Sequence, residues 1–264
     1  MTGRRAVPGV ALVPAVIAAA FLALPLLGLL VRVPWSRVGE VLASEVVRSS
    51  LALSLSTSLV ATGLSIVLGL PLAWLLARGD LPGRALVRAV VTLPLVLPPV
   101  VGGLALLGAL GPDGLVGAAL RERLGVTVVS TSVAVVLAQT FVSMPFFVLS
   151  VEGALRGMDR RLDEAAASLG ASRWTTMRRV TLPLLAPSIA AGAVLAWARA
   201  IGEFGATVTF AGSLPGRTQT LPLAIYAALE SDPQVASVLG LVLLGVCLTL
   251  LLALRGRWLG KVTR

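Results

Sequence analysis

Residues 163–187 read DEAAASLGASRWTTMRRVTLPLLAP, a polar and alanine-rich segment set between long apolar runs. Asp163 and Glu164 open the run EAAASL, and acidic side chains stabilise the positive N-terminal end of a helix. Alanine has the highest helix propensity of all residues, so the run predicts a short helix. Gly170 then interrupts it and permits a sharp turn. The segment is therefore too rich in helix-forming residues to be an open connector.

A second helix start follows the turn. Ser172 can accept a hydrogen bond from the first turn of a helix that runs from Arg173, and Leu182-Pro183 closes the unit where the next apolar run begins. We predict two short helices joined at Gly170. Their shallow apolar face is formed by Ala165, Ala166 and Leu169. This pattern alone fits either a compact loop resting on a membrane or a projection that docks a soluble partner.

The composition of the whole chain indicates that water is not its main solvent. Of its 264 residues, 57% are hydrophobic and 13% are charged, whereas soluble domains are usually about a quarter charged. The chain has no histidine and one cysteine, Cys247, which excludes an internal disulfide, a Cys/His metal site and imidazole catalysis. It also lacks the G-x-x-x-x-G-K-[ST] pattern of a P-loop. We therefore expect no enzymatic activity, metal site or bound cofactor in this chain.

The apolar runs predict an all-α, polytopic membrane protein. A helix needs about 20 apolar residues to cross the bilayer core, and six charge-free runs come close to or exceed that length. They are Gly9–Val31, Ser49–Ala77, Ala89–Pro112, Leu124–Val151, Val180–Ala198 and Pro233–Leu254. The first run is longer than a signal peptide and lacks a small-residue cleavage site, so we expect it to be retained. Two pieces, Phe204–Gly216 and Thr218–Leu229, are too short to span and are expected to be loop, re-entrant or interfacial.

The charge distribution predicts the topology. With six spans and a cytoplasmic N-terminus, 15 of the 22 basic residues fall on the cytoplasmic side, among them Arg4, Arg5, Lys261 and Arg264. This asymmetry is the positive-inside pattern of membrane proteins. It explains the net charge of +10 without nucleic acid as a partner. Both termini and the segment 163–187 are therefore expected in the cytoplasm.

Two of the spans carry unusual residues. The third contains TLPLVLPPVVGG, and prolines inside a helix remove backbone donors and kink it. Such a span is expected to pack inside a bundle or to line a path rather than to face lipid all round. The second span carries a group of six hydroxyl residues within twelve positions, which fit either close helix packing or a pathway. These are Ser54, Ser56, Thr57, Ser58, Thr62 and Ser65.

The polar segment resembles the EAA signature of ABC importer permeases, E-A-A-x3-G-x9-I-x-L-P. Here the same spacing links Glu164-Ala165-Ala166, Gly170, Val180 and Leu182-Pro183, with valine in place of isoleucine as the departure. The resemblance covers residues 45–255 and implies the type-I importer permease fold. Residues 1–44 would then form an N-terminal tail, the first transmembrane helix and an external segment. Residues 256–264 would form a basic cytoplasmic tail.

A narrower likeness points to an oxyanion. Residues 202–231, GEFGATVTFAGSLPGRTQTLPLAIYAALES, look like the corresponding region of molybdate permeases, as does LPLVLPPVVGG in the third span. Sulfate and thiosulfate permeases share the EFG start, but the continuation TFAGSLPGRTQTLPLAIY looks more like the molybdate group. Molybdate, tungstate and sulfate have the same charge and shape, so physical argument does not separate them. The resemblance implies molybdate.

The family implies a division of labour among subunits. ATP and Mg²⁺ would bind a separate ATPase, two copies of which sit beneath a homodimer of the permease in the cell membrane. An extracytoplasmic binding protein would deliver the anion. The residues carried over as the ATPase-docking set are Glu164, Ala165, Ala166, Gly170, Leu182 and Pro183, with Arg173 nearby.

A second set of residues is expected to form the pathway or its gate. A dianion is very costly to place in lipid, so the pathway must supply donors or water. Arg199 and Glu203 are spaced i, i+4 and can pair across one turn, which would make the arginine a structural brace rather than an anion ligand. The candidates are Pro98, Pro99, Arg199, Glu203, Thr207, Thr209 and Arg217.

Two other classes of function fit the sequence less well. A membrane-embedded enzyme would need clustered acids or histidines, and only Glu152 and Glu203 border the spans. A secondary transporter with inverted repeats would need broken helices in both halves. The third span is compatible with that class, but the other half shows no matching segment, and the EAA pattern would remain unexplained.

Overall fold

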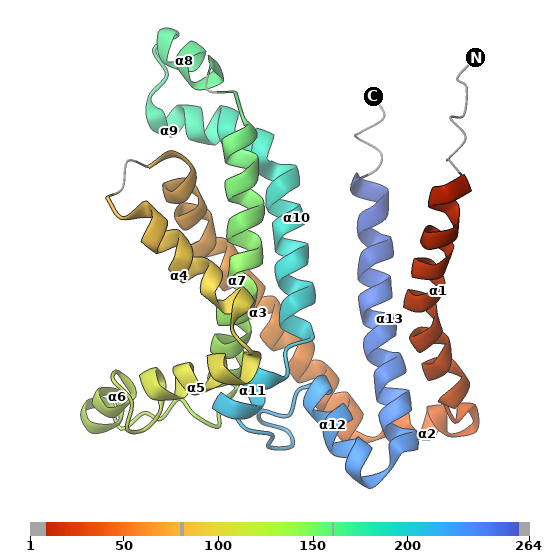
Figure 1. The fold of residues 1–264 in the computed structure, drawn as a ribbon. Coiled ribbons are helices and arrows are strands. Elements are labelled where there is room, and N and C mark those ends of the chain that lie inside the picture. Colours follow the sequence, from red (N-terminus) through yellow and green to blue (C-terminus); the bar gives the residue numbers. More distant parts are fainter. Residues whose placement is uncertain (1–8, 80–81, 160, 259–264) are drawn as a thin grey trace.

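A computed structural model describes residues 9–79, 82–159 and 161–258, and the regular elements in these ranges are all helical (Figure 1). Five of the 15 basic residues counted on the cytoplasmic side lie outside the described ranges, namely Arg4, Arg5, Arg160, Lys261 and Arg264. The elements in chain order are α1 (Gly9–Arg32), η1 (Trp35–Arg37), α2 (Val38–Ala43), α3 (Glu45–Arg78), α4 (Arg84–Val96), α5 (Pro99–Leu110), α6 (Gly117–Leu124), α7 (Ser132–Gly157), α8 (Arg161–Ser168), α9 (Arg173–Thr176), η2 (Met177–Thr181), α10 (Leu182–Ile201), α11 (Gly205–Phe210), α12 (Leu221–Ser231) and α13 (Pro233–Trp258).

The predicted all-α membrane architecture is confirmed. Four helices in the described ranges are long and apolar enough to cross a membrane, and α13 adds a shorter apolar stretch, Pro233–Thr249. The four helices are Leu12–Arg32, Glu45–Arg78, Ser132–Gly157 and Arg173–Ile201. Together with α13 they correspond to the first, second, fourth, fifth and sixth apolar runs. The chain is therefore a multi-pass membrane protein.

The third apolar run is divided rather than continuous. Helix α4 ends at Val96, the backbone is extended at Leu97, and α5 starts at Pro99. In Figure 1, α5 turns away from α4 and lies across the end of the bundle. The cause is Pro98-Pro99, because proline disfavours helical geometry in the preceding residue and has no N–H to donate. The expectation of one span over Ala89–Pro112 is thus replaced by two short helices.

The fourth span also starts later than predicted. Helix α6 ends at Leu124, the next residue, Gly125, has a left-handed φ of +65°, and a loop follows. Helix α7 begins only at Ser132, and the hydroxyl of Thr131 accepts a hydrogen bond from the N–H of Ala134 as its cap. The apolar residues after Leu124 therefore belong to a loop, which hydropathy alone does not reveal.

Helix α7 lies at the centre of the bundle, between α3 and α10 (Figure 1). Of the six hydroxyl residues between Ser54 and Ser65 of α3, five are buried, the exception being Ser56. Ser65 lies 3.4 Å from Ser143 of α7, and Ser54 accepts a hydrogen bond from the N–H of Leu221 at 2.6 Å. Small hydroxyl residues allow such close approach of helices. Of the two interpretations of these residues, the structure supports packing.

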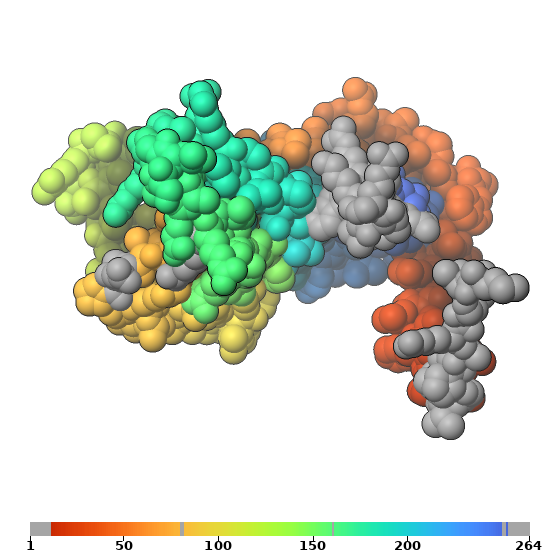
Figure 2. Space-filling model, turned by 90° about the horizontal axis from the view of Figure 1, so that it is seen from above, coloured from red at the N-terminus to blue at the C-terminus, as the bar shows by residue number. Residues whose placement is uncertain are grey.

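The two ends of the bundle carry different elements. The described start of α1, the end of α13 and the segment α8–α9 lie at one end, which we call the inner end (Figure 1). Helices α2, α6 and α12 lie at the opposite, outer end. Seen from above the inner end, α8 and α9 project over one half of the molecule, and α1 stands at the far edge (Figure 2). This arrangement places the polar segment and both described chain ends on one side.

Candidate functional site

The turn between α8 and α9 has the geometry that the sequence predicts. Gly170 adopts a left-handed φ of +78°. The N–H of Gly170 donates to the carbonyl of Ala167 at 2.9 Å, and the N–H of Ala171 donates to that of Ala166 at 3.0 Å. This pair of bonds is the Schellman motif, which closes a helix at a left-handed residue. Helix α8 therefore ends sharply, and the chain direction is fixed.

The helix after the turn starts as predicted but does not end as predicted. The hydroxyl of Ser172 accepts a hydrogen bond from the N–H of Thr175 at 3.2 Å. Helix α9 then continues through the π turn η2 into α10, as one helix from Arg173 to Ile201. The prediction that Leu182-Pro183 closes a separate short helix is wrong. Proline cannot donate a backbone bond, and the widened π turn before it lets the helix continue.

The residues of the predicted docking set lie at the surface of the inner end. Glu164, Ala165, Gly170, Arg173 and Pro183 are exposed, whereas Ala166 and Leu182 are half-buried. Two large apolar side chains beside them are also exposed, Leu169 at 88% and Trp174 at 65%. An exposed apolar patch next to polar residues is typical of a protein interface. The docking role itself stays a prediction.

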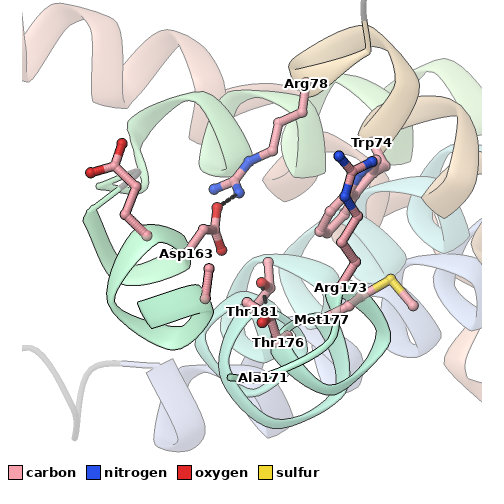
Figure 3. A pocket seen from close by; sticks show the side chains of 10 residues that line it. Trp74, Arg78, Asp163, Ala171, Arg173, Thr176, Met177 and Thr181 are labelled. Atoms are coloured by element: carbon pink, nitrogen blue, oxygen red, sulfur yellow. Dashed lines mark hydrogen bonds and ion pairs between the residues drawn. The ribbon is translucent and has the colours of Figure 1, made fainter. Parts of the chain in front are cut away.

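A pocket of about 350 Å³ lies where this loop meets the end of α3 (Figure 3). Across it, the guanidinium of Arg78 in α3 forms an ion pair with the carboxylate of Asp163 in α8. The same guanidinium carbon lies 5.5 Å from the centroid of the Trp74 ring, within range of a cation–π interaction. The residues that line the pocket are Trp74, Arg78, Asp163, Glu164, Ala167, Ala171, Arg173, Thr176, Met177 and Thr181.

A second ionic cluster ties three helices together at the inner end. The carboxylate of Glu152 in α7 is nearly buried, and it pairs with Arg88 of α4 and with Arg156 at 2.9 Å. Arg156 also donates to the carbonyl of Leu76 in α3 at 3.4 Å. Glu152 is thus compensated by two arginines, as a buried carboxylate requires. We assign it a structural role.

At the outer end, Arg199 and Glu203 form the predicted pair. The nearest guanidinium nitrogen and carboxylate oxygen are 2.5 Å apart, which makes an ion pair. The angle between the two groups does not suit a hydrogen bond. Glu203 lies just beyond the end of α10, and its other oxygen accepts a hydrogen bond from the N–H of Ala206 at 2.8 Å. With its carboxylate 1% exposed, Glu203 links α10 to the start of α11. This geometry fits a brace, and whether the pair also gates a pathway stays a prediction.

Helices α5 and α11 approach each other through glycine. A Cβ atom on Gly103 would lie 2.7 Å from the Cβ of Thr209, and one on Gly205 would lie 2.8 Å from the Cβ of Pro99. The hydroxyl of Thr209 already donates to the carbonyl of Gly205 at 2.8 Å. The structure therefore brings Pro99 and Thr209 into one tight junction. Pro98 is exposed at the break between α4 and α5.

The remaining pathway candidates are not gathered in one place. The hydroxyl of Thr207 is buried without a hydrogen-bond partner. Arg217 is exposed, its backbone carbonyl accepts a hydrogen bond from Ser132, and its side chain forms no ion pair among the described residues. Its side chain is therefore not part of the Arg199–Glu203 brace.

Sequence reasoning missed several polar residues at both ends. The amide of Gln139 in α7 is fully buried, and neither its oxygen nor its nitrogen has a hydrogen-bond partner. A lone glutamine inside an apolar run was the signal available for it. Arg78 and Asp163 were also not paired in advance. The sequence feature that could have suggested this pair is that Arg78 ends α3 and Asp163 lies in the first turn of α8.

The chain is similar to known transport proteins. Residues 65–262 match the family described as binding-protein-dependent transport system inner membrane component. The molybdenum transport system permease protein ModB of Mycobacterium tuberculosis is 46% identical over 246 residues, which is 92% of each chain. A probable sulfate transport system permease protein of Nephroselmis olivacea is 40% identical over 237 residues, 88% of this chain and 83% of that one.

The fold has a counterpart among solved structures. A bacterial ABC transporter involved in the import of the acidic polysaccharide alginate contains a chain that superposes with a TM-score of 0.75 at 20% identity, covering 97% of this chain and 95% of that one. The family match and the helical architecture agree on one assignment. This chain belongs to the family of binding-protein-dependent transport system inner membrane components.

Proposed function

We propose that this chain is the membrane-spanning permease of an ATP-driven importer of molybdate. The observation that carries the proposal is the EAA-type loop, a rigid helix–turn–helix projection at the same end of the bundle as the described chain ends (Figure 1). A projection that couples to a partner must be stiff, and the Schellman turn at Gly170 makes it so. The sequence has no P-loop, so the ATP that drives transport is hydrolysed elsewhere.

The assignment of the anion rests on similarity. The molybdenum permease of Mycobacterium tuberculosis is more similar to this chain than the sulfate permease of Nephroselmis olivacea, at 46% against 40% identity. Molybdate is accordingly the substrate that we propose. Sulfate, thiosulfate and tungstate are the alternatives, since they share its charge and tetrahedral shape.

The partners follow from the same proposal. Two copies of the chain form the pathway, and two ATPase subunits with ATP and Mg²⁺ dock on their α8–α9 loops. A binding protein on the outer side delivers the anion, in keeping with the name of the family. Both chain termini lie in the cytoplasm, because that orientation places 15 of 22 basic residues on the cytoplasmic side.

Transport then proceeds by alternating access. ATP binding brings the two ATPases together, the α8–α9 loops follow them, and the bundle opens outward to receive the anion. Hydrolysis resets it inward. The pathway itself binds the anion weakly, because tight binding in the membrane would slow release, and the binding protein supplies the selectivity.

Reconstitution tests the proposal. The chain is purified with a candidate ATPase and binding protein from the same organism, placed in proteoliposomes, and assayed with radiolabelled molybdate. We expect uptake that requires ATP and the binding protein and that unlabelled tungstate suppresses more strongly than sulfate. Uptake driven by a proton gradient without an ATPase would contradict the proposal and favour a secondary transporter. Stronger suppression by sulfate would keep the permease class and change the anion.

A further inference from the structure

The α8–α9 loop is joined covalently to the bundle at both of its ends, because it follows α7 in the chain and because α9 continues through η2 into α10. It is also joined by the ion pair between Asp163 of α8 and Arg78 of α3 (Figure 3). Within the described ranges, no other side chain of α8 forms an ion pair with the bundle. The loop therefore has a non-covalent connection to a different transmembrane helix.

The positions of the two charges favour this connection. Arg78 is the last residue of α3, and Asp163 lies in the first turn of α8. A cation is stabilised at the negative C-terminal end of a helix and an anion at the positive N-terminal end, so each charge suits its own helix. The side chains are 13% and 30% exposed, and the ring of Trp74 lies beside the guanidinium. The pair is thus partly shielded from water and held in place from one side.

Helix α3 connects this pair to the outer end. It has 34 residues, which at 1.5 Å per residue corresponds to a rod of about 51 Å. Near the inner end, Leu76 packs in the same buried cluster as Phe147 and Val151 of α7. Near the outer end, Ser54 accepts a hydrogen bond from the N–H of Leu221, the first residue of α12. Helix α3, which contains Pro71, is therefore one helix that contacts α8 near one end and α12 near the other.

We propose that Arg78 and Asp163 are positioning residues for energy coupling. Their ion pair persists through the transport cycle and passes the movement of α8 to α3, in parallel with the covalent route through α10. The outer segment at α12 then moves with the docking loop. This inference rests on the proposed function, in which α8 docks the ATPase.

The test is charge exchange in the complete transporter. Arg78→Asp, Asp163→Arg and the double variant are each purified with the ATPase and binding protein, and anion uptake and ATP hydrolysis are measured in proteoliposomes. We expect each single variant to lose about tenfold in uptake per ATP, and the double variant to return to within about threefold of the wild type, as expected for coupled sites. Recovery is incomplete because the exchanged charges face the wrong helix ends.

Two further measurements separate positioning from folding and from docking. The amount of ATPase recovered with each variant and the melting temperature of the complex should match the wild type. Arg48→Asp is the matched control, since Arg48 is an exposed basic residue of α3, the helix that carries Arg78, and it should leave uptake unchanged.

The outcomes distinguish the two proposals. Wild-type uptake in both single variants, or a double variant no better than the poorer single variant, would overturn the role of the pair while leaving ATP-driven transport by the wild type intact. Failure of the wild-type chain to recover an ATPase or to use ATP would instead overturn the proposed function.

Discussion

The inner and outer ends of the bundle differ in how far their buried polar groups have partners. At the inner end, Asp163 and Glu152 are each paired with arginine, and these pairs join four helices. At the outer end, Glu203 is also paired with an arginine, but glycine contacts hold α5 against α11, and the buried polar groups of Gln139 and Thr207 have no partners among the described residues. Satisfied networks rigidify, whereas unsatisfied groups are costly and favour rearrangement. Under the proposed mechanism, we therefore expect the inner end to move as a stiff unit and the outer end to change its contacts.

The largest expected effect tests the stiffness of the docking loop. Gly170→Pro removes the N–H that bonds to Ala167, and proline cannot adopt the φ of +78° found here. We expect uptake to fall by more than about tenfold with membrane insertion intact, since a misplacement of about 1 Å can cost a hundredfold in a positioned system. Glu164→Lys should likewise uncouple ATP hydrolysis from uptake. Uptake assays paired with ATPase assays measure both.

Gly170→Asn is the matched control for the loop. Asparagine tolerates left-handed geometry and retains its N–H, so uptake should stay near the wild-type level. Wild-type uptake by Gly170→Pro would show that the turn is not needed for coupling.

The next effect concerns the outer end. Gly103→Leu places a side chain where a Cβ atom already lies 2.8 Å from the carbonyl oxygen of Ala206. Overpacking of this kind costs about 1–3 kcal/mol of folding stability. The cost is expected near the upper end because the backbone of α11 cannot move aside as easily as a side chain. Thermal unfolding in detergent measures the loss. Gly108→Leu on the same helix is the control, because nothing lies within 4 Å of its Cβ position. Equal losses in the two variants would mean that α5 does not pack on α11.

A smaller effect is expected from the inner cluster. Glu152→Gln leaves Arg88 and Arg156 around a neutral amide. Because both arginines are more than a third exposed, water offsets part of the loss, and we expect about 1–2 kcal/mol of destabilisation. Glu230→Gln, an exposed acid, should have no effect on the same unfolding measurement. An equal loss of stability in both variants would mean that the ion pairs of Glu152 do not stabilise the inner end.

Replacement of the buried amide of Gln139 is expected to change stability in the opposite direction from the substitutions above. Replacing an unpartnered buried polar group by an apolar one of similar size removes a desolvation penalty, so Gln139→Leu should be neutral or stabilising by about 1 kcal/mol. Thr140→Val is the comparison, since that hydroxyl does donate, to the carbonyl of Val136 at 2.7 Å, and its loss should be slightly destabilising. A marked loss of stability in Gln139→Leu would reveal a partner such as a bound water.

The smallest effect lies in the turn between α12 and α13. Loss of hydration alone would raise the pKa of Asp232, but the N–H groups of Gln234 and Val235 and the guanidinium of Arg37 outweigh it and hold that pKa below its ordinary value of 3.8. Ionised Asp232 therefore stabilises the fold above about pH 3.8, and that contribution is lost as the pH falls through the lowered pKa. Asp232→Asn should slightly flatten the acid side of a plot of melting temperature against pH. An unchanged plot would mean that the contacts of Asp232 do not affect stability.

Much of the fold followed from local sequence rules. Charge-free runs located the long helices, and Gly170 and Ser172 located the turn and the cap, because these depend on residues close in the chain. The break at Pro98-Pro99 and the late start of α7 were missed, since a hydropathy count does not register extended backbone inside an apolar run. The continuous helix through Pro183 was missed because a π turn has no simple sequence pattern.

The site was predictable to a similar extent. The EAA spacing identified residues at the inner surface that we propose dock the ATPase, and the i, i+4 spacing identified the Arg199–Glu203 pair. The pairing of Arg78 with Asp163 joins residues that are 85 positions apart, and nothing local specifies such a contact. Arg217 was grouped with Arg199 because both are near the outer end, which does not establish contact.

The most direct test of the central claim is the side of the membrane on which the α8–α9 loop lies and what covers it. Leu169→Cys is placed in a Cys247→Ser background, since Leu169 is 88% exposed and Cys247 is the native cysteine. A membrane-impermeant maleimide should label it in inside-out vesicles stripped of the ATPase, and the bound ATPase should protect it. Labelling from the outer face of right-side-out vesicles, or labelling that the ATPase does not reduce, would contradict the account.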